Sequence, residues 1–204
     1  MVKPGFVLGN GRSRLSIGLD DIKTHGRVYG CNALYRDFTP DVLVATDPGI
    51  AQEIEHSGYA LKNEFYTRQP NINLGSKLIP DHHGFSSGPV AVKIAAQRAH
   101  EVIYLIGFDL QGKAGKQNNI YSGTENYRKT DDKETFYGNW VNQLAQIFRE
   151  HPNQKFVRLV PRDGIVPVQW LSCTNHITQW VDDFMPNINN KPWQRSKELV
   201  TNIK

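Results

Sequence analysis

The chain has 204 residues, a formal net charge of +4, and 39% hydrophobic and 22% charged residues. This length suits one domain with a core of its own, and no apolar run approaches the roughly 20 residues that a membrane-spanning helix needs. The two cysteines form no CxxC pair, which argues against a zinc site or a disulfide framework.

The first predicted element is the strand Phe6–Leu8, which runs directly into the glycine-flanked turn Gly9-Asn10-Gly11. A helix is expected to follow, because apolar residues recur in the next segment. Glycines let a backbone pass close to a ligand, and the N–H groups at a helix start attract anions. Asn10 and Ser13 add side-chain donors. The turn therefore predicts a site for a nucleotide or another phosphate ester.

Two familiar phosphate-binding motifs do not fit this turn. Arg14 stands where the full G-x-G-x-x-G fingerprint has its third glycine, and no Gly-Lys-Ser/Thr follows. An ordinary strand-to-helix turn capped by Ser13 therefore stays open as the alternative.

Strands and helices alternate along the rest of the chain. Short apolar runs predict further strands at Val28–Cys31, Val42–Ala45, Lys77–Ile79, Val102–Ile106 and Phe156–Val160. Helices are predicted at Ala51–Ser57, Pro89–His100 and Thr135–Glu150, and near Thr174–Phe184. This alternation predicts an α/β, Rossmann-like fold: a mostly parallel sheet with helices on both faces.

Polar or glycine-rich turns follow several of these strands. Asn32 and Asp47 come after the second and third strands, Ser87-Gly88 opens the long helix, and Asp109 follows the strand that ends at Ile106. Each turn alone has a structural explanation as a cap or a bend. Ligands of such folds bind at the carboxyl ends of the strands, so the turns together predict one binding site.

Two segments stand apart from this pattern. We expect a Rossmann-like domain over residues 1–165, with a mobile loop at 111–133 that could close over a ligand. A solvated insertion is the alternative for this loop. Residues 166–204 are expected to form an aromatic-rich extension packed on the domain or on a partner subunit, so an oligomer is possible. We expect a cytoplasmic protein, because the first residues do not make a signal peptide. Nucleic acid is a weakly supported partner, since the chain lacks a dense basic stripe.

Taken in order, the motifs of residues 5–162 resemble those of the bacterial lipooligosaccharide sialyltransferase family. The matching residues are Gly9-Asn10-Gly11-x-Ser13, Cys31-Asn32, Ser87-Gly88 and Ile103-Tyr104-Leu105-Ile106-Gly107-Phe108-Asp109. The same framework resembles the hydroxymethyl-dihydropterin diphosphokinase-like family, above all in Pro40-Asp41-Val42-Leu43-Val44-Ala45-Thr46-Asp47-Pro48.

The first resemblance implies a glycosyltransferase that uses a CMP-sugar-like donor and an unknown acceptor. The residues expected to bind the nucleotide are Gly9, Asn10, Gly11, Ser13, Asn32, Ser87, Gly88 and Asp109. Tyr121 and Tyr127 would contact the departing phosphate. The family's general-base histidine is missing from residues 134–138, and His83, His82 or Glu134 could take its place.

The second resemblance implies a different chemistry. A diphosphokinase would use Asp47, together with Asp109, to hold Mg²⁺ on a triphosphate. The leading hypothesis is therefore a nucleotide-dependent transferase of the nucleotide-sugar class. The alternatives are a Mg²⁺/ATP-dependent pterin-type diphosphokinase and a nucleotide-binding protein without catalysis.

Overall fold

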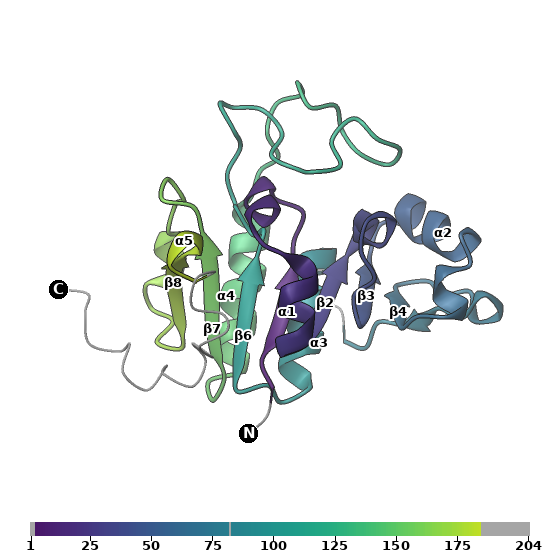
Figure 1. The fold of residues 1–204 in the computed structure, drawn as a ribbon, viewed down its shortest axis with the longest axis horizontal. Helices are drawn as coiled ribbons and strands as arrows, with labels where there is room; N and C mark the ends of the chain where they lie inside the picture. The colour runs from purple at the N-terminus through teal and green to yellow at the C-terminus, as the bar shows by residue number, and fades with distance from the viewer. Residues whose placement is uncertain (1–2, 82, 185–204) are drawn as a thin grey trace.

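One parallel sheet forms the centre of the molecule (Figure 1). The computed structural model describes residues 3–81 and 83–184. In that part of the chain the strands are β1 (Gly5–Leu8), β2 (Arg27–Cys31), β3 (Val42–Ala45), β4 (Phe65–Thr67), β5 (Lys77–Leu78), β6 (Val102–Ile106), β7 (Lys155–Val160) and β8 (His176–Trp180). They form one eight-stranded sheet in which every pairing is parallel.

The strand order is β5-β4-β3-β2-β1-β6-β7-β8, which places β1 inside the sheet. The chain first builds outward from β1 through β2 to β5. It then crosses back and adds β6, β7 and β8 on the other side of β1. In register, Gly5 pairs with Arg27 of β2 and with Ile103 of β6. The order reverses between β1 and β6, and such a switch point is where open α/β sheets bind ligands.

Helices cover both faces of this sheet (Figure 1). Helices α3 and α4 pack on one face with Val7 of β1, whereas α1, α2 and α5 pack on the other face with Phe6 and Leu8. Neighbouring strand residues thus enter two separate cores. The helices are α1 (Leu19–His25), α2 (Pro48–His56), α3 (Ser87–Gln97), α4 (Gly138–Glu150) and α5 (Val181–Phe184). The expected α/β, Rossmann-like fold is confirmed, with a sheet that is parallel throughout its described strands.

Local sequence explains where α2 begins and which faces of α3 and α4 are buried. Pro48 stands in the first turn of α2, where its missing N–H costs nothing. Helix α4 is amphipathic, and it turns Leu144, Ile147 and Phe148 into the core. Helix α3 is buried along nearly its whole length, which agrees with its run of small and apolar residues.

Two elements differ from the sequence-based expectation. Strand β4 was not expected, because its three residues are too few to form a clear apolar pattern. The helix expected near Thr174–Phe184 is wrong over most of its length, since His176–Trp180 is strand β8 and the helix α5 spans Val181–Phe184 alone. An edge strand with half-buried residues lacks the continuous apolar run of a central parallel strand.

The remaining connections are irregular or short 3₁₀ turns. The turns are η1 (Arg12–Ser16), η2 (Asn32–Arg36), η3 (Tyr59–Leu61), η4 (Ile72–Leu74) and η5 (Val168–Trp170). The segment between β6 and α4 extends beyond the carboxyl edge of the sheet (Figure 1). Within the described ranges, no helix is long and apolar enough to cross a membrane. Residues 185–204 of the expected extension lie outside the described residues.

Candidate functional site

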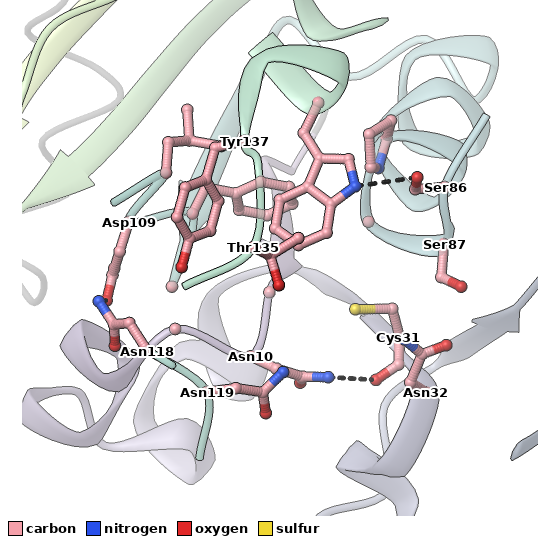
Figure 2. Close-up of a pocket in the computed structure, with 18 of the residues that line it drawn as sticks. Asn10, Cys31, Asn32, Ser86, Ser87, Asp109, Asn118, Asn119, Thr135 and Tyr137 are labelled. Carbon is pink, nitrogen blue, oxygen red and sulfur yellow. Dashed lines mark hydrogen bonds between the residues drawn. The ribbon is translucent and has the colours of Figure 1, made fainter. Parts of the chain in front are cut away.

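A cavity of about 280 Å³ opens at the switch point between β1 and β6 (Figure 2). Its volume lies near the small end of the range for ligand sites, which is about 300–1,000 Å³. Of the expected site residues, Gly9, Asn10, Gly11, Asn32, Asp47, Ser87, Gly88 and Asp109 line it. The other lining residues are Cys31, Ser86, Pro89, Gly107, Phe108, Leu110, Gln117, Asn118, Asn119, Thr135, Tyr137 and Trp140.

The glycines after β1 bring two backbone segments together. A Cβ on Gly9 would lie 2.5 Å from the carbonyl oxygen of Gly107, and one on Gly11 would lie 2.6 Å from Cγ of Asp109. Gly107 itself has a φ of +73°, which favours glycine. The glycines that were expected to approach a ligand are thus needed for the contact between the loops after β1 and β6.

The chain itself uses the N–H groups of the loop after β1. Gly11 donates to the Gly107 carbonyl oxygen at 2.9 Å, and the Arg12 N–H donates to Oδ1 of Asn118 at 3.1 Å. The backbone N–H of Ser13 donates to Oδ2 of Asp109 at 3.1 Å, and its hydroxyl hydrogen-bonds to Oδ1 of that carboxylate. A carboxylate of the protein therefore occupies the place where this turn was expected to hold a phosphate. Ser13 does not line the cavity.

The N-terminus of α3 offers free donors instead. Ser87 and Gly88 are its first residues and line the cavity, and no partner for their backbone N–H groups occurs among the described residues. The Ser87 hydroxyl is fixed, because its Oγ accepts the Thr46 N–H at 2.9 Å and lies 2.8 Å from Oγ1 of Thr46. The helix dipole adds positive potential at this end. An anionic group fits here without a basic side chain.

Two asparagines reach the cavity from β1 and β2. Asn10 Nδ2 lies 3.5 Å from the Cys31 carbonyl oxygen (Figure 2), and Asn10 Oδ1 accepts from Arg14 at 2.9 Å. Asn32 has a φ of +53°, an uncommon conformation outside glycine. Its buried Oδ1 has no hydrogen-bond partner in the structure. This oxygen is a polar atom that a ligand donor could satisfy.

Two buried arginines stand behind the cavity wall. Arg14 donates to the Gly9 carbonyl oxygen at 2.9 Å and to the Tyr121 hydroxyl at 2.9 Å. Arg158 of β7 is fully buried and donates to the carbonyl oxygens of Phe108, Ile165 and Asp109 at 2.6–2.8 Å. Burial lowers the pKa of Arg158 to about 10, against a raising influence of Asp109. Their donors hold the two loops in place.

The segment between β6 and α4, together with the first turn of α4, forms the remaining wall, which sequence reasoning missed. Trp140 Nε1 donates to the Ser86 Oγ at 2.9 Å (Figure 2), and Tyr137 packs edge-on against Trp140 at 5.3 Å. Asn118 Nδ2 donates to Asp109 Oδ2 at 2.9 Å. Burial raises the pKa of Tyr137, with Glu134 and Asp109 adding to the effect. Its phenol therefore stays protonated at neutral pH.

The expected catalytic residues lie outside the cavity lining. Arg14 donates to the hydroxyl of Tyr121, and burial raises the pKa of this hydroxyl to about 12. The Ala33 N–H donates to the Tyr127 hydroxyl at 3.1 Å. His83 has a φ of +47° and lies beside the Phe85 ring. His82 lies outside the described residues, and Glu134 accepts the Gly112 N–H at 2.7 Å. The catalytic roles of these residues stay predictions.

The two carboxylates expected to bind metal differ in their surroundings. Asp47 lines the cavity at the N-cap of α2, yet its side chain does not cap that helix. Asp109 already accepts three hydrogen bonds, from Ser13 and Asn118. No group of three or more His, Cys, Asp or Glu that could hold a metal ion occurs in residues 3–81 and 83–184. Asp47 could bind Mg²⁺ together with ligand phosphates and water, whereas Asp109 would first have to release Ser13.

Cys31 is the thiol in the cavity wall. Its side chain is buried, and burial raises the pKa of its thiol to about 12. A thiol that stays protonated is a poor nucleophile, so Cys31 fits a packing role.

Comparisons with known proteins add no relative to this description. No family model matches the chain, and no curated protein or solved structure matches it. The cavity itself is therefore the feature of the molecule that bears on function.

Proposed function

We propose that this protein is a nucleotide-dependent transferase, a glycosyltransferase that takes its glycosyl group from a nucleotide-sugar donor. One observation carries the proposal: the free N-terminal amides of α3 open into the switch-point cavity between the Asn10 and Asn32 side chains and an aromatic wall. Phosphate, nucleoside and glycosyl group each have suitable partners there.

The donor phosphate belongs at the N-terminus of α3. The N–H groups of Ser87 and Gly88, together with the helix dipole, can bind one phosphate group. The same donors would stabilise the negative charge that develops on the nucleotide as it departs. Asn10, which lines the same cavity, can also contact this phosphate.

The nucleoside belongs on the side of the cavity formed by β1 and β2. The unpaired Oδ1 of Asn32 can accept a hydrogen bond from a base amino group or a ribose hydroxyl. Binding would thereby satisfy a buried acceptor, which is worth about 1–3 kcal/mol.

The transfer breaks the bond between the anomeric carbon and the phosphate oxygen, whose electron pair stays on the nucleotide. The acceptor hydroxyl forms the new bond and loses its proton. Asp47 is a cavity carboxylate without a hydrogen-bond partner among the described residues, so it can take this proton in place of the missing histidine. Tyr121 and Tyr127 stay candidates for contact with the phosphate after a movement of the loop.

The pterin-type diphosphokinase is the second candidate, and the position of Asp47 favours it. An unpaired carboxylate beside the N-terminus of α3 could hold Mg²⁺ on a triphosphate. Because Asp109 is engaged by Ser13, Asp47 would have to act with waters and phosphate oxygens alone. A non-catalytic nucleotide-binding protein would show binding without turnover.

A thermal-shift screen tests these candidates. CMP, UMP, GMP, AMP, ATP and their sugar conjugates are added with Mg²⁺ or with excess chelator. Saturation at 100 times the Kd should add about 2.7 kcal/mol of stability. Binding of a nucleotide-sugar in chelator supports the transferase, and Mg²⁺-dependent ATP binding that Asp47→Asn abolishes supports the diphosphokinase. Absence of any shift would contradict both.

A matched pair of variants tests the phosphate position. Gly88→Pro removes one N–H from the first turn of α3, where proline is tolerated, and Gly88→Ala keeps it. We expect Gly88→Pro to weaken nucleotide binding at least tenfold. Gly88→Ala keeps the N–H and should have only a small effect, which comes from the close contact of its Cβ with the Phe108 ring at 3.2 Å. Equal nucleotide affinities of the two variants would show that the phosphate does not bind at the N-terminus of α3.

A further inference from the structure

The wall contributed by the segment between β6 and α4 and by the first turn of α4 has an unusual chemical character. It presents carboxamides, hydroxyls and aromatic rings to the cavity: Gln117, Asn118, Asn119, Thr135, Tyr137 and Trp140. Figure 2 shows Thr135 and Tyr137 across the cavity from Asn10 and Asn119. Thr135 and Tyr137 therefore lie across the cavity from Asn10, whereas Asn119 lies on the same side as Asn10.

Acidic side chains line the cavity, whereas basic side chains do not. Asp47 and Asp109 line it, whereas none of its lining residues, all within the described part of the chain, is Lys, Arg or His. The nearby cations Arg14 and Arg158 donate hydrogen bonds to carbonyl and side-chain oxygens behind the wall, so these donors do not face the cavity. An anionic substituent on the glycosyl group would lose its water without gaining a charged partner.

From this arrangement we infer that the wall is a subsite for a neutral glycosyl group, and that the protein discriminates against donors whose sugar carries a carboxylate. This inference rests on the proposed function and names the substrate class of the same site. It departs from what the resemblance to sialyltransferases implies, because sialic acid is a carboxylated sugar.

The wall contains suitable partners for a neutral sugar. The Nδ2 group of Asn119 has no partner among the described residues, and the Thr135 hydroxyl has one long hydrogen bond, 3.2 Å to Oε1 of Gln117. These groups can bind sugar hydroxyls. The rings of Tyr137 and Trp140, held at 5.3 Å from each other, give an apolar surface for the C–H face of a pyranose. The α3 amides are already assigned to the phosphate, so they are not left for a sugar carboxylate.

Matched donor pairs that differ in one carboxylate test the inference by calorimetry. The pairs are UDP-glucose with UDP-glucuronic acid, GDP-mannose with GDP-mannuronic acid, and the methyl ester of CMP-sialic acid with CMP-sialic acid. In each pair that binds, the neutral member should bind at least tenfold tighter, which is about 1.4 kcal/mol. Equal affinities, or tighter binding of the acidic member, would overturn the inference and leave the proposed function standing.

Two variants at one position separate charge from size. Thr135→Lys places a cation in the wall, and Thr135→Met has similar length without the charge. We expect Thr135→Lys to strengthen binding of the acidic member at least fivefold and Thr135→Met to leave the preference unchanged. If both variants change the ratio of affinities for the neutral and acidic donors alike, the wall does not discriminate by charge and the inference is wrong. If CMP, UMP, GMP and all pairs fail to bind, the proposed function fails and the inference falls with it.

Discussion

The carboxylate of Asp109 accepts hydrogen bonds from both the backbone N–H and the hydroxyl of Ser13. The two residues follow neighbouring strands, β6 and β1, and Asp109 also lines the cavity. In effect the protein supplies its own anion to the turn after β1. This relationship is one reason why we propose the N-terminus of α3, rather than this turn, as the position of a ligand phosphate.

Removal of this carboxylate should destabilise the fold. Asp109→Ala leaves the N–H and hydroxyl of Ser13 without their acceptor and removes one of the two acceptors of Asn118 Nδ2, so we expect it to lower the free energy of unfolding by about 2–4 kcal/mol. Ser13→Ala should cost about 1 kcal/mol and weaken nucleotide binding through the loop. Urea denaturation measures both, with the exposed Ser172→Ala as the control. An Asp109→Ala variant as stable as the parent would contradict this role.

The contact between Glu53 and the segment after β6 should be sensitive to acid. Although burial alone would raise it, the pKa of Glu53 is lowered by hydrogen bonds from Arg36, Tyr35 and Asn126. The stability that Glu53 contributes is therefore present above its ordinary pKa of about 4.5 and is lost as pH falls through the lower folded value.

Glu53→Gln tests this contact. We expect a loss of about 1–2 kcal/mol at pH 7 that disappears well below pH 4. Hydrogen exchange at Thr124 and Asn126 should become faster in the variant, because Arg36 and Glu53 bind both residues. A loss of stability that does not change with pH would show that charge is not the cause.

His176 should limit stability in mild acid. Burial, helped by Arg158, lowers the pKa of His176 to about 4, and its Nε2 has no hydrogen-bond partner. The folded state thus disfavours the protonated ring, and stability falls as pH drops from about 6.5 toward 4.

Replacement of this ring by phenylalanine should remove the sensitivity. His176 stacks on Phe148 at 5.1 Å and meets Trp170 at 4.7 Å, so Phe can keep these contacts. We expect His176→Phe to be close to neutral at pH 7 and about 2 kcal/mol more stable than the parent at pH 5. Urea titrations at the two pH values would contradict the prediction if the difference between the proteins stayed constant.

Tyr121 and Tyr127, which the sequence predicts to contact the departing phosphate, both make hydrogen bonds within the protein. If nucleotide moves the loop and brings Tyr121 or Tyr127 onto phosphate, each Phe variant should lower turnover about 10²–10³-fold and affect affinity less. Tyr127→Phe also leaves the Ala33 N–H unpaired, at a cost of about 1–3 kcal/mol. Unchanged turnover, with unchanged hydrogen exchange of residues 111–133 on nucleotide addition, would leave only the structural role.

Much of the sheet follows from its sequence, and part of the site does too. Buried runs such as Val42–Ala45 have the uniform apolar pattern of a central parallel strand, so their position was predictable. The switch-point rule then brought Asn10, Asn32 and Ser87 to one cavity. The wall residues Gln117, Asn118 and Asn119 were not predictable, because an irregular loop has no period that tells which side chains turn inward. Trp140 lies on the predicted helix α4, but the helical period did not show that its ring reaches the cavity.

Ser13 shows a different limit of sequence reasoning. Its position in a glycine turn suits a phosphate ligand, but the sequence does not reveal which anion reaches it. Asp109 follows β6, and its approach depends on strand pairing and on the glycines that let the two loops touch. Long-range competition for a donor is decided by packing rather than by the motif.

The position of β1 in the sheet has a consequence for biosynthesis. Gly5 pairs with Ile103, so β1 leaves the ribosome well before β6, its second neighbour in the sheet, has been synthesised. Until then Gly9 and Gly11 face no partner and Ser13 has no carboxylate. Pairing of such distant segments is slow to form. A nascent chain arrested before β6 would carry the whole glycine motif and yet lack the cavity, so any ligand of this cavity could bind only after β6 has been synthesised.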